Sequence, residues 1–148
     1  MDEHTKQAQA DEAGDRRGAP VSHAEIIAAA VRYLHDSTSG RWDQAEPFVA
    51  DNVRFVFPGA EFASLAAMRD GLVRRYTGME KHIDTTDVAS ASDSTVIIVS
   101  GTLSGTNLHG VPFQGVRFLD RLVIRDGLLV EQHVFNDLAI SGVLDRHN

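Results

Sequence analysis

Apolar residues recur at helical spacing near the start of the chain and at alternate positions through its second half. Ser22 and Glu25 have the spacing of a capping box, in which each side chain caps the backbone N–H of the other residue. Apolar positions then recur every three to four residues, so one face of a helix is apolar. The pattern predicts a helix from Ser22 to about His35.

Two further helices and one strand are predicted before the middle of the chain. A short helix is expected over Trp42–Val49, with Pro47 close to its end. Alternation over Val53–Phe57 indicates a strand, which the turn residues Pro58-Gly59 end. Ser64 is the N-cap candidate of a third helix, and apolar spacing extends this helix to about Tyr76.

The second half of the chain is strand-like. Alternating and β-branched residues predict strands over Lys81–Ala89, Thr95–Thr106, Phe113–Arg125 and Leu128–Leu138. Asp126-Gly127, between the last two, is a strong hairpin signal. Helices followed by antiparallel strands indicate an α+β fold.

Glycines inside the long strands indicate that the sheet bends. Gly101, Gly105 and Gly115 interrupt segments that otherwise carry bulky side chains. We therefore expect a cone-shaped, strongly bent, mainly antiparallel sheet wrapped around about three N-terminal helices. Such a bend leaves an internal pocket between the concave face of the sheet and the helices.

Composition narrows the class of protein. The 148 residues carry a formal net charge of −7, which disfavours nucleic acid and anionic membranes as partners. The absence of cysteine excludes thiolate metal sites and cysteine nucleophiles. Residues 1–20 are polar and have the composition of a disordered tail, and residues 21–148 have the length of one domain. No secretory signal is recognised, so we expect a cytoplasmic protein.

Asp120 breaks the apolar pattern of its strand. The segment VRFLDRLVIRDG, residues 116–127, alternates, with Phe118 and Leu122 on one face and Arg117 and Arg121 on the other. Asp120 lies in the middle of the apolar face, where a lone carboxylate is costly unless it is partnered, protonated or lining a cavity. Either a pocket or a satisfied core carboxylate accounts for it.

The order of elements resembles that of the nuclear transport factor 2-like superfamily, which includes ketosteroid isomerase and the SnoaL-like polyketide cyclases. The final stretch, IRDGLLVEQHVFNDLAISGVL, is the part most similar to SnoaL-like proteins. By resemblance to ketosteroid isomerase, Tyr33 and Asp120 occupy the positions of an oxyanion hole. The position of that enzyme's general base is Phe57 here, which cannot accept a proton.

The same resemblance implies the remaining pocket residues. Gln132 and Asn136 are expected as polar ligand contacts, with sheet-edge or interface positions as the alternative. Apart from the resemblance, proton transfer needs a base, and His82 and Asp84, which share one face of the strand over Lys81–Ala89, are the candidate bases, although the pattern favours a solvated position for each. The expected apolar walls are Phe55, Phe57, Phe118 and Val134.

Two hypotheses follow for the function. The first is a cofactor-independent isomerase or lyase, meaning an isomerase, dehydratase or cyclase, acting on an apolar carbonyl compound by oxyanion stabilisation and proton transfer. The second is a non-catalytic module of the same fold that binds a hydrophobic ligand or assembles through its sheet. Neither a metal nor a cofactor is expected, and the resemblance implies a homodimer packed through the outer sheet face.

Overall fold

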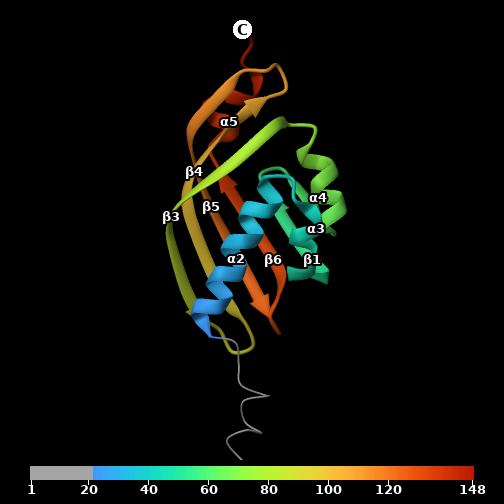
Figure 1. The fold of residues 1–148 in the computed structure, drawn as a ribbon, viewed down its shortest axis with the longest axis vertical. Helices are drawn as coiled ribbons and strands as arrows, with labels where there is room; N and C mark the ends of the chain where they lie inside the picture. Colours follow the sequence, from blue (N-terminus) through green and yellow to red (C-terminus); the bar gives the residue numbers. More distant parts are fainter. Residues whose placement is uncertain (1–21) are drawn as a thin grey trace, which may run out of the picture.

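The computed structural model describes residues 22–148, and the tail expected at residues 1–20 lies outside them. One six-stranded sheet, in the order β2-β1-β6-β5-β4-β3, bends around a long helix, α2, that lies across its concave face (Figure 1). None of the helices in the described part is long and apolar enough to cross a membrane. The elements are α2 (His23–Thr38), α3 (Trp42–Ala45), η1 (Glu46–Phe48), β1 (Val49–Phe57), β2 (Ala60–Phe62), α4 (Leu65–Leu72), β3 (Tyr76–Ser90), β4 (Thr95–Asn107), β5 (Pro112–Arg125), β6 (Leu128–Asn136), α5 (Leu138–Ser141) and η2 (Val143–Asp145).

The sheet is mixed, because β1 runs parallel to β6 while all the other neighbouring strands pair antiparallel. This arrangement confirms the α+β class and the bent, mainly antiparallel sheet. The short strand β2 was not expected. It pairs with the end of β1 after the turn at Pro58-Gly59, where Gly59 has a φ of 77° that favours glycine.

Helix α2 begins where the capping box places it. The Ser22 hydroxyl accepts a hydrogen bond from the Glu25 backbone N–H at 3.2 Å. Ala30 and Leu34 are fully buried against the sheet, so the apolar stripe fixes which face of the helix turns inward. The helix continues past the predicted end at His35 to Thr38, whose hydroxyl donates to the Leu34 carbonyl at 2.6 Å.

The second predicted helix is shorter than expected. The α-helical part ends at Ala45, and a 3-10 turn, η1, follows over Glu46–Phe48. Pro47 is the cause, because proline cannot donate a backbone hydrogen bond and fits only the first positions of a helix. The chain is therefore extended from Val49, and β1 starts earlier than the predicted Val53.

The third helix also ends early, and this shift positions part of the site. Helix α4 stops at Leu72 instead of about Tyr76. The Arg75 backbone N–H donates to the Leu72 carbonyl at 3.0 Å, which closes a turn. Tyr76 then pairs with Asn107 of β4, so β3 starts at Tyr76 and not at Lys81. The pairing with β4 outweighs the local helical spacing.

Two glycines of β4 permit the bend of the sheet. A Cβ atom added at Gly101 would lie 1.9 Å from the His82 carbonyl oxygen, and one added at Gly105 would lie 2.1 Å from the Gly78 carbonyl oxygen. The register between β3 and β4 shifts close to both positions. The backbones approach more closely here than any residue with a side chain allows.

The last strand, β6, ends where the chain turns into the short helix α5. Strand β6 stops at Asn136 and not at the predicted Leu138, because the Asn136 side chain accepts a hydrogen bond from the Leu138 N–H at 3.1 Å and α5 begins. Asn107, fully buried, donates to the carbonyls of Val143 and Arg146 and so holds the chain after α5 against the end of β4.

We expect Gly101→Ala to lower the free energy of unfolding by at least about 2 kcal/mol, because the new methyl group meets backbone that cannot move without breaking the β3–β4 ladder. Urea denaturation followed by circular dichroism measures this change. Gly78→Ala is the matched control on β3, since no heavy atom lies within 4 Å of the added methyl group. Equal stability of the two variants would show that the bend does not depend on Gly101.

Candidate functional site

Asp120 is fully buried on the concave face of the sheet. Its neighbours on that face of β5, Phe118 and Leu122, are buried as well. One carboxylate oxygen, Oδ2, contacts the amine Nζ of Lys81 on β3, and the other, Oδ1, has no hydrogen-bond partner within residues 22–148. Arg117 and Arg121 point to the opposite face, as the alternation predicts, and pair with other carboxylates there. The partner of Asp120 is therefore a residue from another strand.

Lys81 is the charged residue that faces the interior. It shares one face of β3 with Met79 and Ile83, which pack toward the core. Its side chain is 10% exposed. Its amine lies 4.8 Å from the centre of the Phe118 ring, at a distance typical of a cation–π contact. Lys81 lines the inner cavity described below, whereas Asp120 does not line it.

The surroundings of Asp120 favour its protonated form relative to a carboxyl in water. Burial raises the pKa of Asp120, because desolvation penalises the charge. The Lys81 ammonium is the largest opposing effect, and the Gln132 side chain is a smaller one. The net direction is upward because one lysine and one amide do not replace the hydration of a fully buried carboxylate.

Tyr33 joins this group through Gln132. Its hydroxyl, on α2, donates to the Gln132 side-chain oxygen on β6 at 2.7 Å, and its ring packs 5.4 Å from Phe48. Burial, together with the nearby charge of Asp120, raises the pKa of Tyr33, so the hydroxyl stays neutral and remains a donor. Tyr33 does not line the inner cavity. The structure thus gathers Tyr33, Gln132, Asp120 and Lys81 into one polar group within an apolar core.

The inner cavity lies between the concave face of the sheet, α4 and the end of α2, and has a volume of about 50 Å³. Since pockets that enclose a drug-sized ligand measure about 300–1,000 Å³, this space holds small groups and not a polycyclic ligand. Its charged lining residues are Lys81 and Arg75, and no Asp, Glu or His of the described part lines it. Burial raises the pKa of Tyr76, a further lining residue, to about 12.

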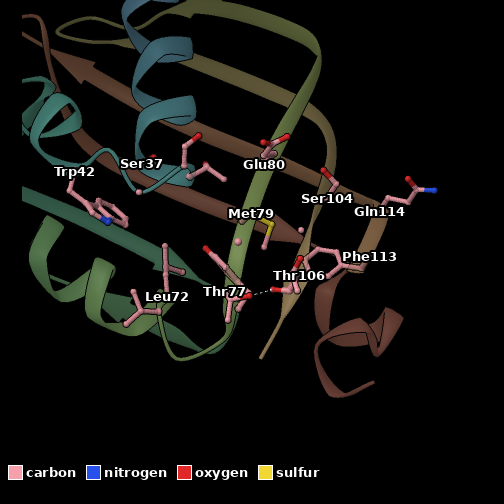
Figure 2. A pocket seen from close by; sticks show the side chains of 17 residues that line it. Ser37, Trp42, Leu72, Thr77, Met79, Glu80, Ser104, Thr106, Phe113 and Gln114 are labelled. Carbon is pink, nitrogen blue, oxygen red and sulfur yellow. Dashed lines mark hydrogen bonds between the residues drawn. The ribbon is translucent and has the colours of Figure 1, made fainter. Parts of the chain in front are cut away.

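A larger hollow of about 580 Å³ adjoins the inner cavity at the start of β3. In Figure 2, β3 runs between Trp42 and Leu72 on one side and Phe113 and Gln114 on the other. The hollow and the inner cavity share lining residues from α2, α4 and β3, which places them side by side. The shared residues are Ser37, Thr38, Leu72, Tyr76 and Met79.

The structure separates the expected pocket residues into two groups. Phe57, Gln132, Val134 and Asn136 line the inner cavity. Phe118 lies under the Lys81 amine, outside the lining.

Phe55 is fully buried in the core of β1, opposite Gln132 of β6, and does not line the inner cavity. Of the two wall residues expected on β1, Phe57 lines the inner cavity and Phe55 does not.

His82 and Asp84, the expected bases, lie on the outward side of β3. Both side chains are exposed and pair with each other at 3.2 Å, and neither lines the inner cavity or the hollow. Their alternation with Lys81 and Ile83 on the strand is the reason. A catalytic role for them stays a prediction that the geometry does not favour. Among residues 22–148, no group of three or more histidine or acidic side chains is arranged to hold a metal ion.

Two residues of the site were missed from the sequence. Lys81 was placed at the start of a predicted strand. Its position two residues before the apolar Ile83, and so on the same face of the strand, was the signal that it points inward. Arg75 was expected inside the third helix, which was predicted to run to about Tyr76. It lines the inner cavity because α4 ends at Leu72, and no local signal in the sequence marks that end.

The fold and part of the sequence match known proteins. The SnoaL-like domain family model matches residues 30–132, more than half of the chain. No curated protein sequence matches. A putative SnoaL-like polyketide cyclase from Jannaschia sp. CCS1 is 18% identical, with a TM-score of 0.65 over 88% of this chain and 99% of that one.

Two further solved structures share the fold. TerC, co-crystallised with polyporic acid, is 18% identical, with a TM-score of 0.66 over 82% of this chain and 98% of that one. ActVI-ORFA from Streptomyces coelicolor is 19% identical, with a TM-score of 0.61 over 78% of this chain and 96% of that one. Identities this low establish a common fold and leave the activity open.

We expect the side-chain carboxyl carbon of Asp120 to titrate with a midpoint above its ordinary pKa of 3.8 in carbon-13 NMR, because burial is the dominant effect. Lys81→Met should move the midpoint higher, since it removes the largest opposing charge. The Asp120→Asn spectrum identifies the resonance. A midpoint below 3.8 would show that the ion pair outweighs desolvation.

The raised pKa of Asp120 also makes the stability of the fold depend on pH. A raised folded-state pKa means that the native protein holds this proton more tightly than the unfolded chain does. The stability from Asp120 is therefore complete below pH 3.8 and is lost as the pH rises through the folded-state pKa. We expect the free energy of unfolding of the wild type, minus that of Asp120→Asn, to fall as the pH rises from about 4. A difference that rises over this range would contradict the assignment.

Proposed function

Starting from the fact that the chain belongs to the SnoaL-like domain family, we propose that it is a cofactor-independent isomerase, dehydratase or cyclase acting on an apolar carbonyl compound. The observation that carries the proposal is that Lys81 lines the inner cavity while its amine contacts the buried carboxyl of Asp120, which does not line the cavity. The names of the neighbouring structures support the reaction class, since one is a putative polyketide cyclase.

Lys81 is the group that acts on the substrate oxygen. An ammonium has three N–H donors, and Asp120 occupies one side of it, which leaves the others for a ligand. A carbonyl oxygen that gains negative charge in the transition state is stabilised by such a donor, most strongly where water is excluded. Asp120 is a positioning residue in this scheme, and the Tyr33–Gln132 hydrogen bond holds the polar group behind it.

The lining of the cavity restricts the substrate. No Asp, Glu or His in the described part of the chain lines the inner cavity, so no such side chain is in place there to take a proton from carbon, and the acidic residue that lines the adjoining hollow is Glu80. The chemistry therefore suits a C–H bond that is already acidic, such as one flanked by two carbonyls or by a carbonyl and an aromatic ring. Its proton then passes to water in the adjoining hollow.

The two volumes set the orientation of such a ligand. The inner cavity of about 50 Å³ accepts a carbonyl or a group of similar size, whereas the hollow of about 580 Å³ has room for rings. The walls of the hollow include Trp42, Leu72 and Phe113, which suit a flat apolar body. The substrate consequently enters with its polar end first.

A non-catalytic ligand-binding module is the second candidate. The lack of a base in the inner cavity favours it, because binding requires the donors and the apolar walls and does not require a proton acceptor. The two candidates differ in one measurable property, the exchange of a carbon-bound proton of the ligand.

A homodimer is part of the proposal. Leu119 and Phe135 lie opposite each other on the outward face of β5 and β6 and are 40% and 56% exposed. Ion pairs border them, Arg117 with Asp137 and Arg121 with Glu131, so the rim carries both signs of charge. An apolar centre with a mixed rim suits a second copy related by a two-fold axis.

We expect Lys81→Met to slow the exchange of the C1 protons of 2-tetralone for deuterium by about 100-fold, the loss typical of removing one oxyanion donor. Proton NMR in deuterated buffer follows this exchange directly. Asp87→Asn, which removes an exposed charge from the same strand, is the control and should leave the rate unchanged. Binding of 2-tetralone without exchange above the buffer rate would favour the binding module over the enzyme.

We expect Phe135→Asp to convert the dimer into a monomer in sedimentation equilibrium, because the charge is placed at the centre of the apolar patch. Ile140→Asp is the matched control, since Ile140 is 88% exposed on α5, outside the patch. A wild-type chain that sediments as a monomer would refute the dimer and leave the proposed chemistry unaffected.

A further inference from the structure

The inner cavity has an excess of positive charge in a chain that is negative as a whole. Arg75 and Lys81 line it, and no acidic side chain of residues 22–148 does, although the formal net charge of the chain is −7. Lys81 is balanced by Asp120. Arg75 forms no salt bridge with any described residue, whereas Arg54 and Arg69 pair with exposed acidic neighbours. The positive charge of Arg75 is therefore available to a ligand.

The backbone places Arg75 at the boundary between the two spaces. It follows the turn that closes on Leu72 and directly precedes Tyr76, the first residue of β3. Leu72 and Tyr76 both line the inner cavity and the hollow. A ligand that passes from the hollow toward Lys81 passes this turn.

Arginine and tyrosine together suit an anionic oxygen group. The planar guanidinium donates two parallel hydrogen bonds to a carboxylate. Tyr76 is adjacent, and with a pKa raised to about 12 its hydroxyl is neutral at pH 7 and is a further donor. The inner cavity of about 50 Å³ accepts small groups, such as a carboxylate and the carbonyl next to it, and excludes the rings that carry them.

We propose that the ligand of this site carries an anionic oxygen group, a carboxylate or an acidic enol, and that Arg75 binds this group while the neighbouring carbonyl oxygen faces Lys81. A β-keto acid or an acidic enol on an aromatic body has the required arrangement. This inference rests on the proposed function and deepens it, because it assigns the substrate class and a residue that determines specificity.

Isothermal titration calorimetry with 2-naphthoate and 2-naphthamide tests the inference. The two probes have the same rings and nearly the same shape, and differ in charge. We expect the wild type to bind 2-naphthoate at least ten-fold more tightly than 2-naphthamide. Arg75→Gln should abolish this preference, and Arg74→Gln should retain it, since Arg74 is exposed like Arg75 but lines neither space. Thermal melting of both variants verifies that they remain folded.

Each other outcome is decisive. Equal affinity of the two probes for the wild type would overturn the anionic ligand and leave the proposed chemistry standing. A preference that survives in Arg75→Gln, or disappears in Arg74→Gln as well, would overturn the role of Arg75. If the wild type binds neither probe but still exchanges the protons of 2-tetralone, the inference fails alone. If it neither binds nor exchanges, the proposed function fails with it.

Discussion

The contact between Lys81 and Asp120 depends on the curvature of the whole sheet. Lys81 is on β3 and Asp120 on β5, with β4 between them. On a regular sheet, the residue of β3 in line with Asp120 is Thr86, through Val99 of β4. Lys81 precedes Thr86 on β3. It reaches Asp120 because the sheet bends toward its concave face. The bend requires the close backbone approaches at Gly101 and Gly105, so the site and the fold share one cause.

The contact also changes the interpretation of Asp120. A carboxyl on the apolar face of a strand suggests an acid that meets the ligand itself. In the structure, Asp120 does not line the inner cavity, whereas Lys81, whose amine contacts the Asp120 carboxyl, does. The group offered to a ligand is consequently positive, and a second positive group, Arg75, lies at the entrance. Both features favour oxygen atoms that carry or acquire negative charge.

Local signals in the sequence were sufficient for most of the fold. The capping box at Ser22, the turn at Asp126-Gly127 and the alternation around Asp120 each act within a few residues, and each has the predicted consequence. The resemblance to SnoaL-like proteins directed attention to β6, where Gln132 and Asn136 line the cavity.

Other features depend on contacts between distant segments. The end of α4 at Leu72 is set by the pairing of Tyr76 with Asn107, which no local spacing reveals. The partnership of Lys81 with Asp120 crosses an intervening strand and one register shift, between Ile83 and Thr85 of β3. Such pairs are decided by the three-dimensional path of the sheet and cannot be derived from the alternation of either strand alone.

The affinity of a series of substituted naphthols for the wild type and for Lys81→Met would test the central claim most directly. If the Lys81 amine, held by Asp120, is the donor that faces the cavity, affinity for the wild type rises with the acidity of the naphthol. In Lys81→Met this dependence is lost, while binding driven by the apolar rings remains. The same dependence on acidity in both proteins would contradict the account, because some other group would then be the donor.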